Sequence, residues 1–121
     1  MKEIKVAIMP KEAMKEYTLQ IARGNLKPGL DAPKIFFPSM RAMSEALNEN
    51  NQALMAAINK YHPETVSDLA KLVQKDLGNV SRALKRLEGY GLIKMEKQAG
   101  KPDKTPTLTA DKISFEMQLT G

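Results

Sequence analysis

Polar and basic side chains recur between Asn79 and Arg86 at spacings that would place them on one side of a helix. At about 100° per residue they point away from an apolar stripe formed by Val80, Leu84 and Leu87. Asparagine and arginine can each make two hydrogen bonds to a base edge in the major groove of DNA, and lysine and serine suit phosphate contacts. The candidate DNA-binding residues of this helix are Asn79, Ser81, Arg82, Lys85 and Arg86. Taken alone, the pattern also fits an amphipathic helix with a solvated basic face.

A second basic cluster follows, in a stretch with the pattern of a β-hairpin. Residues 92–97 alternate in part, residues 99–104 are basic and rich in turn formers, and residues 107–109 can return as the partner strand. A helix followed by a basic hairpin is typical of winged helices, in which the wing lies along phosphates or reaches the minor groove. The candidate wing contacts are Lys97, Lys101 and Lys104.

The excess positive charge of the chain is concentrated in these two clusters. The formal net charge is +5, and residues 75–104 carry eight Lys and Arg against four Asp and Glu, whereas residues 60–74 are balanced. A basic stripe attracts polyanions through the phosphate backbone and its counterions. Charge alone fits an ordinary solvated surface equally well.

Residues 65–76 predict the helix that would hold the basic helix in place. Thr65 is a candidate N-cap with Asp68 three residues later, and Asp76 can cap the next helix with Asn79 at its third position. Two short helices joined by so few residues must cross steeply, as in a helix-turn-helix. The apolar face of the first helix consists of Val66, Leu69, Ala70 and Val73.

These stretches resemble a known class of proteins. Residues 81–88 (Ser-Arg-Ala-Leu-Lys-Arg-Leu-Glu) and Gly91-Leu92-Ile93 resemble the recognition helix and wing entry of prokaryotic winged helix-turn-helix regulators of the MarR-like type, and residues 66–70 resemble their preceding helix. The resemblance covers about residues 64–109. The whole chain resembles a prokaryotic family of predicted MarR-like DNA-binding regulators, some of them antitoxin-like. The resemblance implies recognition-helix contacts from Asn79, Ser81, Arg82 and Arg86, and wing contacts from Lys97, Lys101 and Lys104.

The two ends of the chain depart from the MarR-like pattern. Typical MarR-type proteins have long helices at both ends for dimerisation, whereas residues 4–8 and 113–119 alternate here as strands, the second through Ile113, Phe115, Met117 and Leu119. Because an exposed strand needs a partner, we expect the two strands to pair, within one chain or between two. Our hypothesis is a homodimer, which would set two recognition helices about one DNA turn apart on a palindromic operator. A monomer is the alternative.

The region between these parts is predicted to be mainly helical. Residues 11–23 form one helix, and residues 24–38, with three prolines and two glycines, form a loop anchored on the core by Phe36 and Phe37. Ser39 caps a helix with Met40, Met43 and Leu47 on one face. Residues 48–51 break it, and a further helix runs to about Lys60 with Leu54, Ala57 and Ile58 buried.

The predicted fold class is α+β: a winged helix-turn-helix with an N-terminal strand-helix extension and a β-wing. Residues 1–38 would form a dimerisation or partner element, and residues 39–121 the winged-helix domain with its C-terminal strand. The expected function is that of a sequence-specific double-stranded DNA-binding transcriptional repressor, with the recognition helix at about 77–90 and the wing at about 94–109. The alternative is an antitoxin-like or other protein-interaction module, with residues 24–38 as the contact surface because Phe36 and Phe37 are costly to expose.

Composition narrows the remaining function classes. The chain has no cysteine and one histidine, His62, which lies at a helix end and suits a capping or surface role. It has no Walker A sequence, dinucleotide-binding glycine pattern or EF-hand loop, so we expect no enzymatic activity, no cofactor and no metal. No apolar run approaches membrane-spanning length, so we expect a cytoplasmic protein without a membrane partner.

Overall fold

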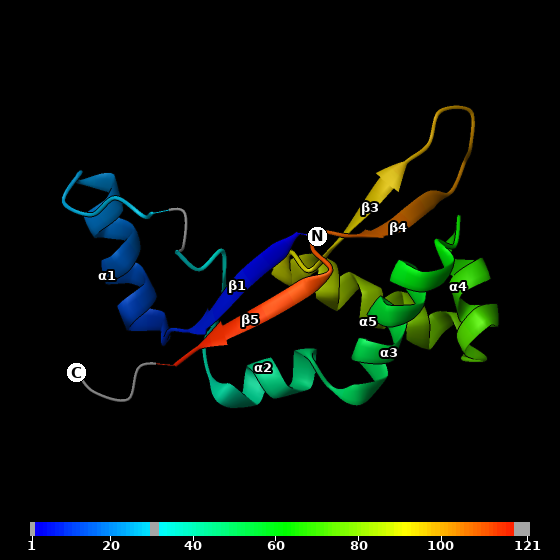
Figure 1. Ribbon diagram of the computed structural model, residues 1–121, viewed down its shortest axis with the longest axis horizontal. Coiled ribbons are helices and arrows are strands. Elements are labelled where there is room, and N and C mark those ends of the chain that lie inside the picture. The colour runs from blue at the N-terminus through cyan, green and yellow to red at the C-terminus, as the bar shows by residue number, and fades with distance from the viewer. Residues whose placement is uncertain (1, 30–31, 118–121) are drawn as a thin grey trace.

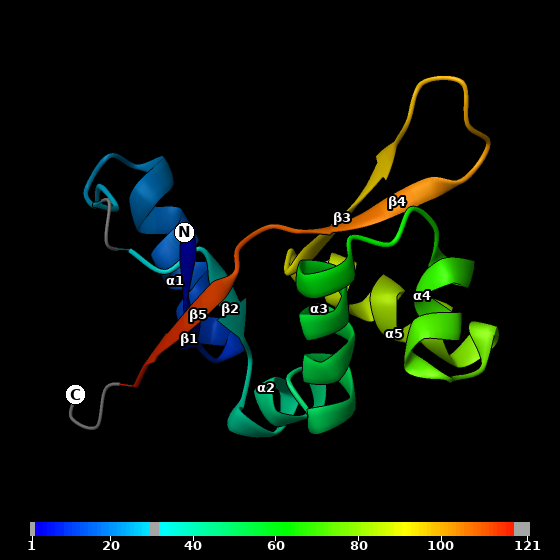
Figure 2. The ribbon, with the colours of Figure 1, turned by 45° about the vertical axis from the view of Figure 1, so that its right-hand side comes forward.

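The computed structural model describes residues 2–29 and 32–117 (Figure 1, Figure 2). Five helices and five strands combine in this part of the chain, which confirms the predicted α+β class. None of the described helices is long and apolar enough to cross a membrane. The elements are, in chain order, β1 (Glu3–Ile8), α1 (Lys11–Ala22), β2 (Ile35–Phe37), α2 (Met40–Ala46), α3 (Glu49–Tyr61), α4 (Val66–Val73), α5 (Leu77–Tyr90), β3 (Ile93–Lys97), β4 (Lys104–Leu108) and β5 (Lys112–Glu116).

Three strands that are remote in the sequence form one parallel sheet, in the order β2-β1-β5. The strands near the two ends of the chain therefore pair within one chain, and β1 and β5 run side by side in Figure 1. The predicted strand at 113–119 is described only in part, because β5 ends at Glu116 and Leu119 lies outside the described residues. The predicted loop at 24–38 is wrong for residues 35–37, since their backbone pairs with the distant strand β1.

The two faces of this sheet have different partners. Val6 and Ile35 lie opposite each other in register and, with Phe37, are buried in the core shared with the helices. Phe36 alternates to the other face, where its ring lies 5.5 Å from that of Tyr17 of α1. Phe37 thus anchors this segment on the core as predicted, whereas Phe36 is half-buried and packs against Tyr17 of α1 on the other face.

Capping side chains set the bounds of α2 and α3. Ser39 Oγ accepts a hydrogen bond from the Ala42 N–H at 3.1 Å, as predicted. The predicted break at 48–51 is confirmed only at Asn48, whose side chain accepts from the Asn51 N–H at 2.8 Å and so begins α3, because residues 49–51 already form its first turn. The buried side chain of Asn51 donates in turn to the Ala46 carbonyl at 2.9 Å, which ties α3 back to the end of α2.

The predicted inner face of α2 is wrong at Met40, which is 47 % exposed. The buried residue of this helix is Ala46, and Met43 is partly buried beside it. Met40 lies about 120° around the helix from Ala46, so it points away from the core. In α3 the predicted stripe of Leu54, Ala57 and Ile58 is buried as expected.

Two glycines near the end of α5 should respond oppositely to substitution by alanine. Gly91 ends the helix at φ +86°, whereas a Cβ at the exposed helical Gly89 would have no neighbour within 4 Å. Gly89→Ala should raise the free energy of unfolding by about 0.5–1 kcal/mol, and Gly91→Ala should lower it by about 1–2 kcal/mol. Urea denaturation followed by circular dichroism measures both. Equal effects of the two substitutions would contradict the placement of the helix end.

Candidate nucleic-acid interface

α4 and α5 are joined by a three-residue connection with defined caps at both sides. The Thr65 side chain accepts from the Asp68 N–H at 3.0 Å, and Gln74 ends α4 in the left-handed region at φ +55°. Asp76 then begins α5, since its Oδ2 atom accepts from the Asn79 N–H at 3.1 Å. The predicted caps of both helices are confirmed, and the short connection orients α5 firmly against α4.

The inner face of α5 is fully packed. Val80, Leu84 and Leu87 are each at most 2 % exposed, within the predicted bounds of residues 77–90. The opposite face carries the predicted contact residues, which are all exposed: Asn79, Ser81, Arg82, Lys85 and Arg86. Within the described residues no carboxylate forms an ion pair with Arg82, Lys85 or Arg86. The outer face of α5 is therefore a row of cations available to an external anion.

Arg82 and Asn79 are linked at the start of this face. The Arg82 Nη2 group donates a hydrogen bond to Asn79 Oδ1. The guanidinium lies close to Gly78, where a Cβ would come within 3.4 Å of Arg82 Nη1 and 3.1 Å of Asp76 Oδ2. Glycine at this position leaves room for the arginine, so the two side chains suited to base contacts form one unit at the helix N-terminus.

The predicted hairpin follows α5 directly and projects beyond the helices in both views (Figure 1, Figure 2). Its second strand begins at Lys104 and not at the predicted residue 107. Pro106 obscured the start of this strand in the sequence, because proline has no N–H to donate to a sheet. In the structure Pro106 is buried in a two-stranded sheet, where each strand has one side without a partner strand and no N–H is needed on that side.

Two of the three predicted wing lysines face each other across the hairpin. Lys97 and Lys104 are directly opposite in register, and both are exposed. Like charges at directly opposed positions repel each other, and in the described part of the chain no carboxylate is paired with either. A bound anion would relieve this repulsion, so the pair is suited to a phosphate.

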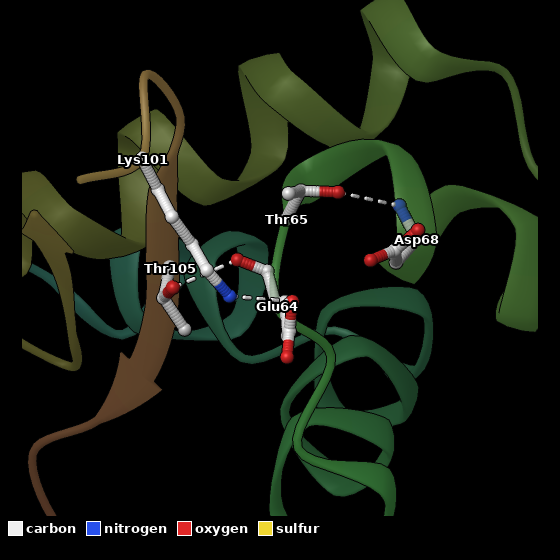
Figure 3. Close-up of polar contacts among 5 residues, drawn as sticks. All are labelled: Glu64, Thr65, Asp68, Lys101 and Thr105. Atoms are coloured by element: carbon white, nitrogen blue, oxygen red, sulfur yellow. Dashed lines mark hydrogen bonds and ion pairs between the residues drawn. The ribbon is translucent and has the colours of Figure 1, made fainter. Parts of the chain in front are cut away.

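The third wing lysine, Lys101, has a partner in the structure (Figure 3). Its Nζ atom lies 2.9 Å from a carboxylate oxygen of Glu64, and both side chains are largely exposed. The Thr105 hydroxyl donates to the Glu64 backbone carbonyl at 2.7 Å. An exposed ion pair contributes little stability, so the main effect of these contacts is to position the hairpin beside the N-terminus of α4.

Sequence reasoning missed Glu64 and Thr105 as positioning residues. Glu64 lies 37 residues before Lys101 and 41 residues before Thr105 in the chain, and no local pattern signals contacts of that separation. The one histidine, His62, is the C-cap of α3 as predicted. Across the described ranges, no three His, Asp or Glu side chains are grouped as metal ligands would be.

A family model described as HVO_A0114 matches residues 46–115. The chain belongs to the HVO_A0114 family. The region matched to the HVO_A0114 family runs from the end of α2 into β5, so it contains the whole of α4, α5 and the hairpin. No curated protein and no solved structure matches the chain.

The cap of α5 gives a stability test of this geometry. Asp76→Ala removes the acceptor for the Asn79 N–H and should lower the free energy of unfolding by about 1 kcal/mol. Asp76→Asn keeps a side-chain oxygen and should cost a few tenths of a kcal/mol at most, because Asn and Asp are comparable N-caps. Thermal and urea denaturation compare the two. A loss of similar size in both variants would mean that the side chain does not act as a cap.

Proposed function

We propose that this protein is a winged helix-turn-helix transcriptional regulator that binds double-stranded DNA, with α5 in the major groove and the β3–β4 hairpin as the wing. The observation that carries the proposal is the outer face of α5. Its exposed cations have no carboxylate partner among the described residues, while the opposite face is held by a fully buried stripe. A rigid basic helix of this kind fits the major groove, which admits one α-helix.

The residue types on this face divide into two roles. Arg82 and Asn79 have the fork-shaped hydrogen-bonding groups that read guanine and adenine edges. Ser81 and Lys85 lie toward one side of the face and suit phosphate contacts, and Arg86 can serve either role. On the hairpin, Lys97 and Lys104 would share a phosphate or adjacent phosphates, which offsets their mutual repulsion.

The resemblance of residues 64–109 to MarR-like regulators supports the same function and favours repression. A repressor acts by occupying a promoter, which needs binding and no catalysis, so the proposal includes no enzymatic activity, cofactor or metal. It also requires the cytoplasmic location expected from the sequence.

Arg82→Ala tests whether α5 reads DNA. With duplex from the gene's own upstream region, fluorescence anisotropy should show a loss of about 1–3 kcal/mol, or roughly 5- to 150-fold in affinity, because one bidentate base contact is removed. Lys15→Ala is the matched control, since Lys15 is exposed on α1 across the sheet from α5. It removes the same charge and should change the affinity little.

Competition by an unrelated duplex shows whether the binding measured by anisotropy depends on the DNA sequence. Binding that resists an unrelated duplex and is lost in Arg82→Ala establishes sequence reading by α5. Equal losses in Arg82→Ala and Lys15→Ala would contradict a specific role of α5 and reduce the interaction to general attraction of charge. Absence of binding by the wild type at moderate salt would favour the alternative, a protein-interaction module.

The salt dependence of binding tests the wing. Lys104→Ala should lower the slope of log affinity against log salt by about 1, because one phosphate contact is lost. Lys101→Ala should lower it less, because the Lys101 ammonium is already paired with Glu64. If both substitutions leave affinity and slope unchanged, the hairpin does not contact DNA.

A further inference from the structure

The outer edge of β5 has no strand partner among the described residues. β5 is the last strand of the sheet, and in Figure 2 it lies in front of β1 and β2 with no helix before it. The Lys112 N–H donates to the Lys2 carbonyl on the β1 side. Because backbone groups alternate along a strand, the N–H and C=O groups of Ile113 and Phe115 point to the outer edge. Such an edge is a template for another strand.

We propose that this edge pairs antiparallel with β5 of a second copy of the chain, on a two-fold axis through Ser114. In this register Ile113 lies opposite Phe115 of the second copy, and these are the residues whose backbone groups point outward. The two chains would form one continuous six-stranded sheet. The pairing also covers Phe115, which is 40 % exposed in the single chain.

The charges of β5 select this register. A two-fold axis through Ser114 sets Lys112 opposite Glu116 of the second copy, and the reverse pair forms by symmetry. Within one chain Lys112 is already paired with Glu3 at 3.6 Å, and Glu116 with Lys5 at 3.4 Å, so the new pairs extend an existing row of alternating sign. A shift of two residues in either direction would place Ser114 opposite one of these charges and lose both new pairs.

Ser114 supplies a second, independent observation. In the described part of the chain its Oγ atom is buried and has no hydrogen-bond partner. A buried polar group left unpaired is costly. On the proposed axis the two Ser114 residues form a non-hydrogen-bonded backbone pair, the position at which opposed side chains come closest. A rotation about χ1 that moves each hydroxyl from its own chain toward the axis then gives each the other as its partner.

Cysteine cross-linking tests the pairing, because the natural chain contains no cysteine. Ser114→Cys should form a disulfide-linked species of twice 13.5 kDa under mild oxidation, since Cα atoms of such a pair lie about 4.5 Å apart, within disulfide range. Lys112→Cys is the matched control. Its two copies would be four residues out of register, about 13 Å along the strand, and should not cross-link efficiently. The double variant Lys112→Cys/Glu116→Cys should cross-link again.

The outcomes separate the proposal from its alternatives. Circular dichroism first establishes that each variant folds, and sedimentation gives the mass of the wild type at micromolar concentration. A dimer in which Ser114→Cys cross-links much faster than Lys112→Cys supports the pairing. A wild-type mass of 13.5 kDa with equally slow cross-linking in both variants, or a dimer without this preference, overturns it. No DNA is present, so either result is independent of the proposed DNA binding.

Discussion

The burial of one stripe of α5 is the constraint on which the rest of the candidate interface depends. Val80, Leu84 and Leu87 are enclosed by the core, so the helix cannot rotate without exposing them. This fixes which side chains face outward. The short connection from α4 ends at the Asp76 cap and so fixes the N-terminal end of α5. A cationic face held in one orientation is preorganised for a rigid partner, and it loses little conformational entropy on binding.

The hairpin depends on the same helix, because β3 follows α5 after the single turn at Gly91. Its placement is reinforced from a distant part of the chain by Glu64, which binds both Lys101 and Thr105. Glu64 comes just before the N-cap of α4, so one residue links the start of the helix pair to the hairpin. The opposed pair Lys97 and Lys104 is left on the exposed end of β3 and β4. α5 and the hairpin are thus two basic elements on one connected frame.

Local signals in the sequence were sufficient for the helices and their caps. Thr65, Asp76 and the apolar stripe of α5 predicted α4 and α5 with their bounds, because capping and helical periodicity depend on residues within one or two turns. The sequence did not reveal β2, whose partner is the remote β1, or the contacts of Glu64. The start of β4 was obscured by Pro106. β2 and the Glu64 contacts were missed for the same reason: pairing between distant segments leaves no periodic pattern in either segment. The roles of the predicted contact residues stay predictions, since the fold shows only that they are exposed and that those of α5 share its outer face.

The most direct test of this account is an NMR titration of the ¹⁵N-labelled protein with duplex DNA at low salt. It needs no knowledge of the operator, because phosphate contacts bind any duplex. The account predicts that the amide signals of residues 77–86 and 97–104 change most, while those of α1 and β2 stay in place. Changes centred on α1 and β2, or no change at any DNA concentration, would contradict it.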